Sequence, residues 1–147
     1  MICDDPGGRV RRRLPTIAAV NLINADLHCH SVVSDGTLQP EALAQRAHAN
    51  GVELWALTDH DEIGGVQRAR ETATGLGMRF LSGVEISVTF ANETVHIVGL
   101  GFDPSNPDLE NVLAQTRCGR QSRAQDMAAG LAQVGIKGAY EGALKYV

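Results

Sequence analysis

Histidines and carboxylates, the side chains that most often bind divalent metal ions, gather at a few points along this sequence. His28 and His30 are separated by one residue, and in an extended segment residues two apart point to the same side. Their two imidazoles can therefore contact one ion, and Asp35 follows shortly after them. Imidazole together with carboxylate is the ligand set of hydrolytic Zn²⁺, Mn²⁺ and Fe²⁺ sites.

Further groups of the same kind follow later in the chain. His60 lies between Asp59 and Asp61, Glu85 follows next, and His96 comes after it. Each group alone has an ordinary explanation: helix caps for Asp59 and Asp61, a satisfied core carboxylate for Glu85, a solvated strand residue for His96. A carboxylate such as Glu85 can also bridge two ions, and ions about 3.5–4 Å apart hold the attacking and leaving oxygens in phosphoester hydrolysis. Because the groups occur together, we predict one shared metal site.

The elements expected to position these residues alternate between strand and helix. Strands are predicted at 22–27, 52–57 and 78–81, with helices starting at Pro40 and near Ile63. This order predicts βαβ units, right-handed crossovers and a parallel sheet. Reactive groups gather at the carboxyl ends of parallel strands, where the first three groups lie. Cys29 alternates away from the two histidines and is predicted to pack into the core, whereas His48 is predicted to lie on the surface.

A hairpin and a long helix are predicted after the third strand. The hairpin strands are expected at 84–90 and 94–100, and the helix at 108–134 with an apolar stripe. Arginines recur every three residues on one side of this helix, at Arg117, Arg120 and Arg123. A solvated helix face is the ordinary explanation. If the helix borders the metal site, Arg117 or Arg120 could hold a substrate phosphate with two parallel hydrogen bonds.

Composition narrows the classes of protein and partner. The chain has 147 residues, 44% hydrophobic and 20% charged, which is typical of one globular domain. A net charge of −4 disfavours electrostatic binding to nucleic acid, so no duplex DNA partner is expected. No membrane partner is expected either, because no apolar run approaches the ~20 residues that span a bilayer. Three cysteines without CxxC spacing favour a reducing cytoplasm. We expect a flexible leader at 1–21 and a single domain at 22–147.

These motifs together resemble the polymerase-and-histidinol-phosphatase (PHP) superfamily of metal-dependent phosphoesterases. The matching segments are Asp26–Ser31, Ser34–Gly36, Thr58–Asp61, Gly83–Ser87 and the single residue His96. The resemblance implies an α/β fold, the N-terminal part of a distorted (β/α)₇ barrel. It also implies a trinuclear metal site at the carboxyl face of that barrel.

The resemblance further implies a division of ligands among the ions. His28, His30 and Glu85 would hold one ion, and Asp35 with His60 a second. A third would be held by His96 together with Glu85 as a bridge. Mn²⁺ is the ion we expect, with Zn²⁺, Fe²⁺ and Mg²⁺ as alternatives, and no catalytic residue is expected beyond the ligands. Family members supply a further histidine and an Asp-x-His pair from a later part of the chain. No histidine follows His96 here, so we expect an incomplete domain.

Residues 135–142 are similar to a stand-alone bacterial branch that includes nucleoside 3′,5′-bisphosphate phosphatases and a 5′→3′ exoribonuclease acting on short RNA. We therefore expect hydrolysis of phosphate esters of small nucleotides, or of short RNA 5′ ends, by metal-activated water. A histidinol-phosphate phosphatase and a catalytically incompetent metal-binding fragment are the alternatives. A polymerase-associated proofreading domain is disfavoured because no polymerase sequence accompanies the motifs. Protein partners are not predicted.

Overall fold

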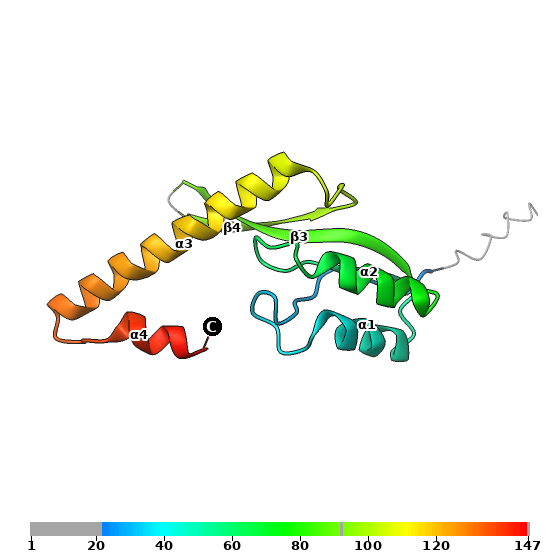
Figure 1. Ribbon diagram of the computed structural model, residues 1–147, viewed down its shortest axis with the longest axis horizontal. Coiled ribbons are helices and arrows are strands. Elements are labelled where there is room, and N and C mark those ends of the chain that lie inside the picture. Colours follow the sequence, from blue (N-terminus) through cyan, green and yellow to red (C-terminus); the bar gives the residue numbers. More distant parts are fainter. Residues whose placement is uncertain (1–21, 92, 147) are drawn as a thin grey trace, which may run out of the picture.

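A four-stranded mixed sheet organises the computed structural model, which describes residues 22–91 and 93–146 (Figure 1). The predicted leader at 1–21 lies outside the described residues. The sheet order follows the chain, with β1 (Ala25–Asp26), β2 (Leu54–Leu57), β3 (Arg79–Phe90) and β4 (Glu93–Leu100). β1, β2 and β3 are parallel, and β4 pairs antiparallel with β3. The predicted α/β class and its βαβ units are confirmed.

The first two helices lie side by side on one face of the sheet (Figure 1). α1 (Pro40–Ala49) connects β1 to β2, and α2 (Val66–Gly75) connects β2 to β3. Because the strand order never reverses, successive crossovers of the same hand bring both helices to the same face. The opposite face stays free of these helices, so it is available to side chains that point out of the strands.

β3 is one continuous strand where two separate strands were predicted, at 78–81 and 84–90. Its residues 79–82 pair with β2 and its residues 83–90 pair with β4. Gly83 stands at the junction, and a Cβ there would lie 2.4 Å from the Leu57 carbonyl oxygen. Glycine therefore allows β2 to approach β3 closely without ending the strand.

The other boundaries differ from the prediction at a few places. β1 contains only Ala25–Asp26, where 22–27 was predicted. α2 begins at Val66 because the Glu62 carboxylate accepts hydrogen bonds from the Ile63 and Gly64 N–H groups, which form a turn before the helix. α1 begins at Pro40 as predicted.

The long C-terminal helix is confirmed as α3 (Pro107–Gln133), and it extends away from the sheet (Figure 1). Of its predicted apolar stripe, Leu113 is buried while Val112 and Met127 are exposed. Two short helices that the sequence did not predict follow, α4 (Ala139–Ala143) and the 3₁₀ helix η1 (Leu144–Tyr146). Among the described residues, none of the helices combines the length and apolarity needed to cross a bilayer.

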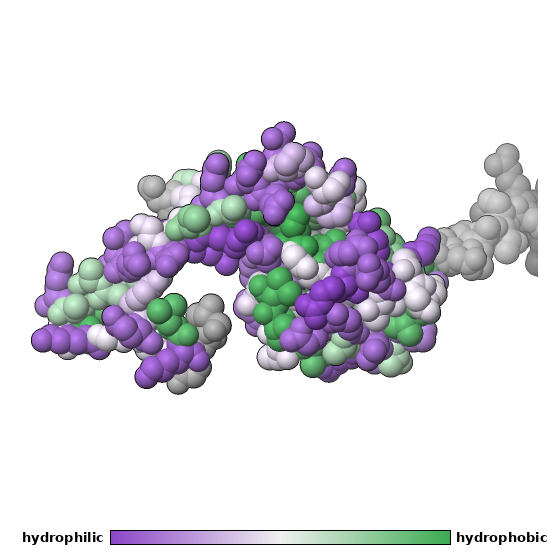
Figure 2. All heavy atoms as spheres, viewed as in Figure 1, coloured by the Kyte–Doolittle hydropathy of each residue, from purple (hydrophilic) through white to green (hydrophobic). Residues whose placement is uncertain are grey.

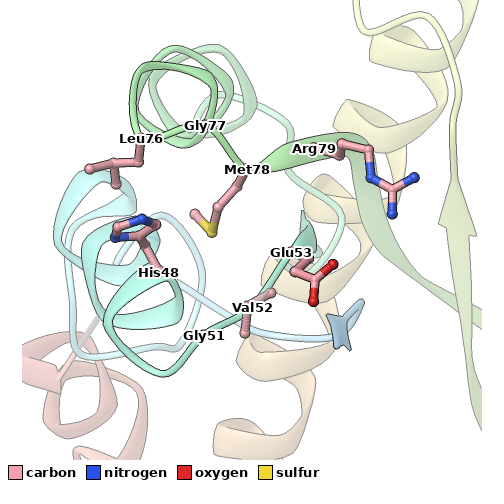
Figure 3. Close-up of a pocket in the computed structure, with 8 residues that line it drawn as sticks. All are labelled: His48, Gly51, Val52, Glu53, Leu76, Gly77, Met78 and Arg79. Carbon is pink, nitrogen blue, oxygen red and sulfur yellow. The ribbon is translucent and has the colours of Figure 1, made fainter. Parts of the chain in front are cut away.

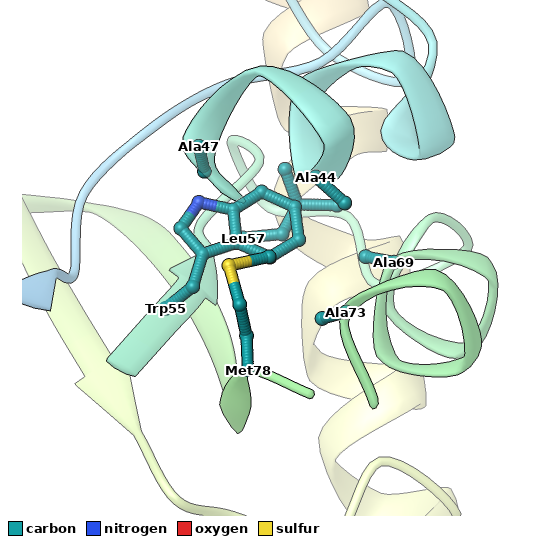
Figure 4. Close-up of a cluster of buried hydrophobic side chains, with 7 residues drawn as sticks. All are labelled: Ala44, Ala47, Trp55, Leu57, Ala69, Ala73 and Met78. Atoms are coloured by element: carbon teal, nitrogen blue, oxygen red, sulfur yellow. The ribbon is translucent and has the colours of Figure 1, made fainter. Parts of the chain in front are cut away.

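The core lies between β2, the start of β3 and the two helices (Figure 4). Small residues let α1 and α2 approach the sheet and each other, while Trp55 and Met78 fill the space between them. Figure 4 shows the indole of Trp55 beneath the alanines of α1. The buried residues of this cluster are Ala44, Ala47, Trp55, Leu57, Ala69, Ala73 and Met78.

Cys29 packs against this core as predicted, and its thiol donates a hydrogen bond to the Ala56 carbonyl at 3.3 Å. Burial, assisted by the negative charge of Asp26, raises the pKa of the Cys29 thiol to about 12. Since the thiolate is the reactive form, Cys29 should resist modification in the folded protein, whereas the exposed Cys118 should react readily. With Cys3 replaced by serine, titration with a chromogenic disulfide should show one fast thiol, and a second only after unfolding. Two equally fast thiols would contradict this.

Candidate metal centre

The segment after β1 is fixed to the segment after β2 by a short run of hydrogen bonds. The Thr58 N–H donates to the Cys29 carbonyl at 2.9 Å, and the Cys29 N–H donates to the Thr58 hydroxyl at 3.1 Å. This pairing turns the Cys29 side chain toward the core. By alternation, His28 and His30 on either side of it point the other way.

Two further chain segments complete the same edge of the sheet. The Asp61 N–H donates to the Glu85 carbonyl at 2.9 Å, so the β2–β3 pairing resumes at His60, opposite Glu85. On β3 and β4, Ser87 stands opposite His96. Glu85 is two residues from Ser87, so Glu85 and His96 share one face of the sheet.

Glu85 lies at the centre of four histidines. Its Oε2 atom is 2.9 Å from His28 Nε2, 3.0 Å from His30 Nε2 and 3.6 Å from His60 Nε2. Its Oε1 atom is 3.8 Å from His96 Nδ1. The Glu85 side chain is only 9% exposed. The two oxygens of one carboxylate therefore face different imidazoles.

Asp35 approaches the same group from the loop before α1. Its Oδ1 atom is 3.3 Å from His30 Nδ1, and its Oδ2 atom is 3.7 Å from His60 Nε2. The structure thus brings together all six residues predicted as ligands. Their donor atoms form three groups, each within 4.8 Å: His28, His30 and Glu85; His30, Asp35 and His60; His60, Glu85 and His96.

Burial and charge set the protonation of two members of this centre. Burial lowers the pKa of His60 below its usual value, and the Glu85 and Asp35 carboxylates offset this only in part. For Glu85, burial alone would raise the pKa, but the His28 hydrogen bond and the charges of His60, His28 and His30 outweigh it and lower the pKa. At neutral pH, His60 is neutral and Glu85 is ionised, which are the forms that bind metal ions.

The donor set also fits divalent ions by its chemistry. The Nε2 atoms of His28, His30 and His60 all face the Glu85 carboxylate, and His60 Nε2 also faces the Asp35 carboxylate. Imidazole nitrogens that converge on carboxylates in this way form the ligand set of divalent ions such as Zn²⁺ and Mn²⁺. A cation would also relieve the desolvation of Glu85.

Asp59 and Asp61 have helix capping as their ordinary explanation. In the structure both are buried, and each binds a segment remote in sequence. Asp59 accepts hydrogen bonds from Ser31 and Ser34, and Asp61 accepts one from the Ser87 N–H. Neither belongs to any of the three groups. The sequence alone could not show whether these aspartates cap a helix or link two loops, because an aspartate in a loop before a helix is equally typical of a cap.

A cleft of about 480 Å³ opens beside the candidate ligands. Its lining includes Asp35 and His60 together with Arg117 and Arg120 of α3. Arg117 donates to the Asp61 carbonyl and pairs with Glu62 at 3.2 Å. Arg120 pairs with the Asp61 carboxylate and donates to the Ser87 hydroxyl. Figure 2 shows hydrophilic side chains concentrated along the underside of α3.

His48 lies elsewhere. It lines a separate cavity of about 490 Å³, at the amino ends of β2 and β3 (Figure 3). The candidate ligands follow the carboxyl ends of the parallel strands, so this cavity lies at the opposite end of the sheet. The exposed position predicted for His48 is confirmed.

Comparison with known proteins shows relatives over most of the chain. A 3′,5′-nucleoside bisphosphate phosphatase from Chromobacterium violaceum is 47% identical over 125 residues, which cover 85% of this chain and 44% of that protein. A 5′-3′ exoribonuclease from Haemophilus influenzae is 43% identical over 118 residues, covering 80% of this chain and 43% of the relative. The chain therefore spans less than half the length of these relatives.

A solved structure shares the fold. The structure of an amidohydrolase from Chromobacterium violaceum, with bound sulfate and no metal, matches with a TM-score of 0.75 and 48% identity. The match covers 84% of this chain and 43% of that chain. The four-stranded mixed sheet thus curls as part of a barrel, as predicted.

The PHP domain family matches residues 26–134. This match contains every segment on which the PHP resemblance was based, from Asp26–Ser31 to His96. By this match and by its identity to the relatives, the chain belongs to the PHP domain family.

Proposed function

We propose that this chain carries the ligands of a metal-dependent phosphoesterase, and that its substrates are small phosphorylated nucleotides or short RNA 5′ ends. The observation that carries the proposal is the convergence of four histidines and two carboxylates beside a cleft lined by arginines. Divalent ions bound there would lower the pKa of a bound water and stabilise the charge that develops on phosphate oxygens.

The geometry supports one division of the ligands. A neutral imidazole offers one lone pair, so His30 and His60 each serve a single ion although each belongs to two groups. A carboxylate has two oxygens, and those of Glu85 face different histidines. We assign His28, His30 and Glu85 to one ion, Asp35 and His60 to a second, and Glu85 with His96 to a third. Mn²⁺ is the ion that we propose.

The arginines of α3 suit a phosphate group on the substrate. A guanidinium has five N–H donors, and the pairings of Arg117 and Arg120 leave some of them free for a ligand. Their side chains are 37% and 38% exposed, so the cleft is accessible. Sulfate, a tetrahedral anion like phosphate, is bound in the Chromobacterium structure. In our proposal Arg117 and Arg120 orient the substrate phosphate toward Asp35 and His60.

The names of the relatives favour nucleotide and RNA substrates for this chain. The test is hydrolysis by the purified chain in Mn²⁺ of three substrates: adenosine 3′,5′-bisphosphate, a 5′-phosphorylated RNA tetramer and histidinol phosphate. We expect turnover of the first two, with the full-length Chromobacterium relative as the positive control. Preference for histidinol phosphate would favour the alternative phosphatase. Mn²⁺ binding without hydrolysis of any substrate would favour a metal-binding fragment.

Metal binding should also stabilise the fold. An ion that binds only the folded chain stabilises it by about 2.7 kcal/mol at a concentration 100 times its dissociation constant. Because the ligands come from four separate segments, we expect Mn²⁺ to raise the unfolding temperature and a chelator to reverse the rise. Thermal unfolding followed by circular dichroism measures this, with Ca²⁺ as the comparison, since Ca²⁺ prefers oxygen ligands. An unfolding temperature that stays the same when Mn²⁺ is added would refute the metal centre.

A further inference from the structure

A buried carboxylate beside the metal centre is left without a role by the ligand assignment. Asp59 is 1% exposed and lies outside the three donor groups. Its Oδ1 atom accepts hydrogen bonds from the Ser31 N–H and the Ser34 hydroxyl, both at 2.7 Å. Its Oδ2 atom accepts one from the Ser31 hydroxyl, also at 2.7 Å. Both oxygens are thus engaged by a single loop.

That loop carries one of the candidate ligands. It runs from Ser31 to Gly36, directly after His30, and it presents Asp35. The loop is tightly folded: the Ser34 and Gly36 N–H groups both donate to the Ser31 carbonyl. A Cβ at Gly36 would lie 2.1 Å from the His30 carbonyl oxygen, so the close approach requires glycine.

Asp35 itself is weakly held. Its side chain is 66% exposed, and apart from its approaches to His30 and His60 it contacts the Ser34 hydroxyl at 3.3 Å. The single proton of that hydroxyl is donated over the shorter distance of 2.7 Å to Asp59. The three hydrogen bonds that Asp59 accepts are shorter, at 2.7 Å each. The loop that carries Asp35 is therefore held by Asp59 more closely than Asp35 is held by its own side-chain contacts.

The backbone of Asp59 is anchored on the other side. Its carbonyl accepts a hydrogen bond from the Glu85 N–H at 3.1 Å, and its neighbour His60 stands opposite Glu85. Asp59 consequently connects the strand that carries Glu85 to the loop that carries Asp35.

We propose that Asp59 is a positioning residue that sets Asp35 against His30 and His60, so that the ligands of the second ion are preorganised before it binds. This inference rests on the proposed function. Groups that orient metal ligands typically change metal affinity 10- to 100-fold when they are removed. The effect of losing Asp59 should be confined to the ion held by Asp35 and His60.

The test compares three variants of the full chain: Asp59→Ala, Asp59→Asn and Asp103→Ala. Asparagine keeps an acceptor for the Ser31 N–H and the Ser34 hydroxyl. The Asp59→Asn variant should therefore keep most of the Mn²⁺ affinity and exchange protection that Asp59→Ala loses. Asp103 is the matched control, because it accepts two hydrogen bonds from Ser105 on an exposed loop outside the donor groups. Mn²⁺ affinity and stoichiometry are measured by calorimetry, and hydrogen exchange is measured on peptides covering 31–36.

We expect Asp59→Ala to weaken Mn²⁺ binding at one site about 10- to 100-fold and to remove hydrogen-exchange protection from 31–36. Both quantities should stay close to the parent values in Asp59→Asn and should be unchanged in Asp103→Ala. An Asp59→Ala variant that binds every ion within twofold of the parent would overturn the inference. If the parent chain itself binds no Mn²⁺, the proposed function fails. The positioning role is then decided by exchange alone: lost protection of 31–36 in Asp59→Ala supports it, and unchanged protection overturns it.

Discussion

Replacement of Glu85 by alanine should reduce the affinity for Mn²⁺ by more than about 100-fold, beyond the range seen when only an orienting group is lost. Glu85 belongs to two of the three donor groups, and its oxygens lie within 3.8 Å of a nitrogen on each of four histidines. Removing it takes away the negative charge that these imidazoles surround. Neighbouring side chains cannot replace it, because Asp35 reaches only His30 and His60.

Calorimetry with Mn²⁺ measures this effect, and Glu93→Ala provides the control. Glu93 is an exposed glutamate on β4, opposite Phe90 and outside the donor groups. Its loss should leave Mn²⁺ affinity unchanged. Circular dichroism must show that the Glu85 variant is folded. A folded Glu85→Ala protein that retains parental Mn²⁺ affinity would rule out a centre built around this carboxylate.

Replacement of Gly83 by alanine should destabilise the fold by about 3 kcal/mol, the upper end of the usual cost of overpacking. The new Cβ would lie 2.4 Å from the Leu57 carbonyl oxygen and 2.7 Å from Thr58 Cγ2. The first of these atoms is backbone, so β2 and β3 would have to separate at the point where the pairing of β3 changes partner. For a chain of this size we expect the unfolding temperature to fall by roughly 10 °C.

Gly99→Ala is the matched control, on the strand that pairs with the same region of β3. Gly99 stands opposite Val84, and a Cβ there would meet Val84 Cγ1 at 3.6 Å, an ordinary contact. We expect its unfolding temperature to stay within a few degrees of the parent. Equal stability of the Gly83 and Gly99 variants in urea unfolding would show that the close approach at Gly83 does not constrain the sheet.

The sequence was sufficient to predict the α/β order because the signals involved are local. α1 begins at Pro40, whose fixed φ angle favours the first turn of a helix. α3 ends at Gln133, shortly before Gly135. The predicted break between 81 and 84 was wrong, because a glycine in a strand can equally mark a close approach between backbones. That approach involves Leu57, which is remote in sequence, so no local pattern could reveal it.

The ligand candidates were found from residue type and spacing, whereas the residues that hold them were not. His28 and His30 share a side by simple alternation, and their types alone suggest metal. Asp59 differs from a helix cap only through its bonds to Ser31 and Ser34, which are tertiary contacts. The apolar residues of α3 likewise carry a helical period, but the period cannot show that Met127 lies exposed.

The two halves of β3 imply an order of assembly. Residues 83–90 pair with β4 across a short hairpin, and hairpins form within about 1–10 μs, so Glu85 and His96 can meet early. His28 is 57 residues from Glu85, and its approach must wait for the parallel strands to pair, at a higher cost in loop-closure entropy. The complete donor set therefore comes together only when β1, β2 and β3 have paired. Tight metal binding should accordingly accompany the last stage of folding and report on its completion.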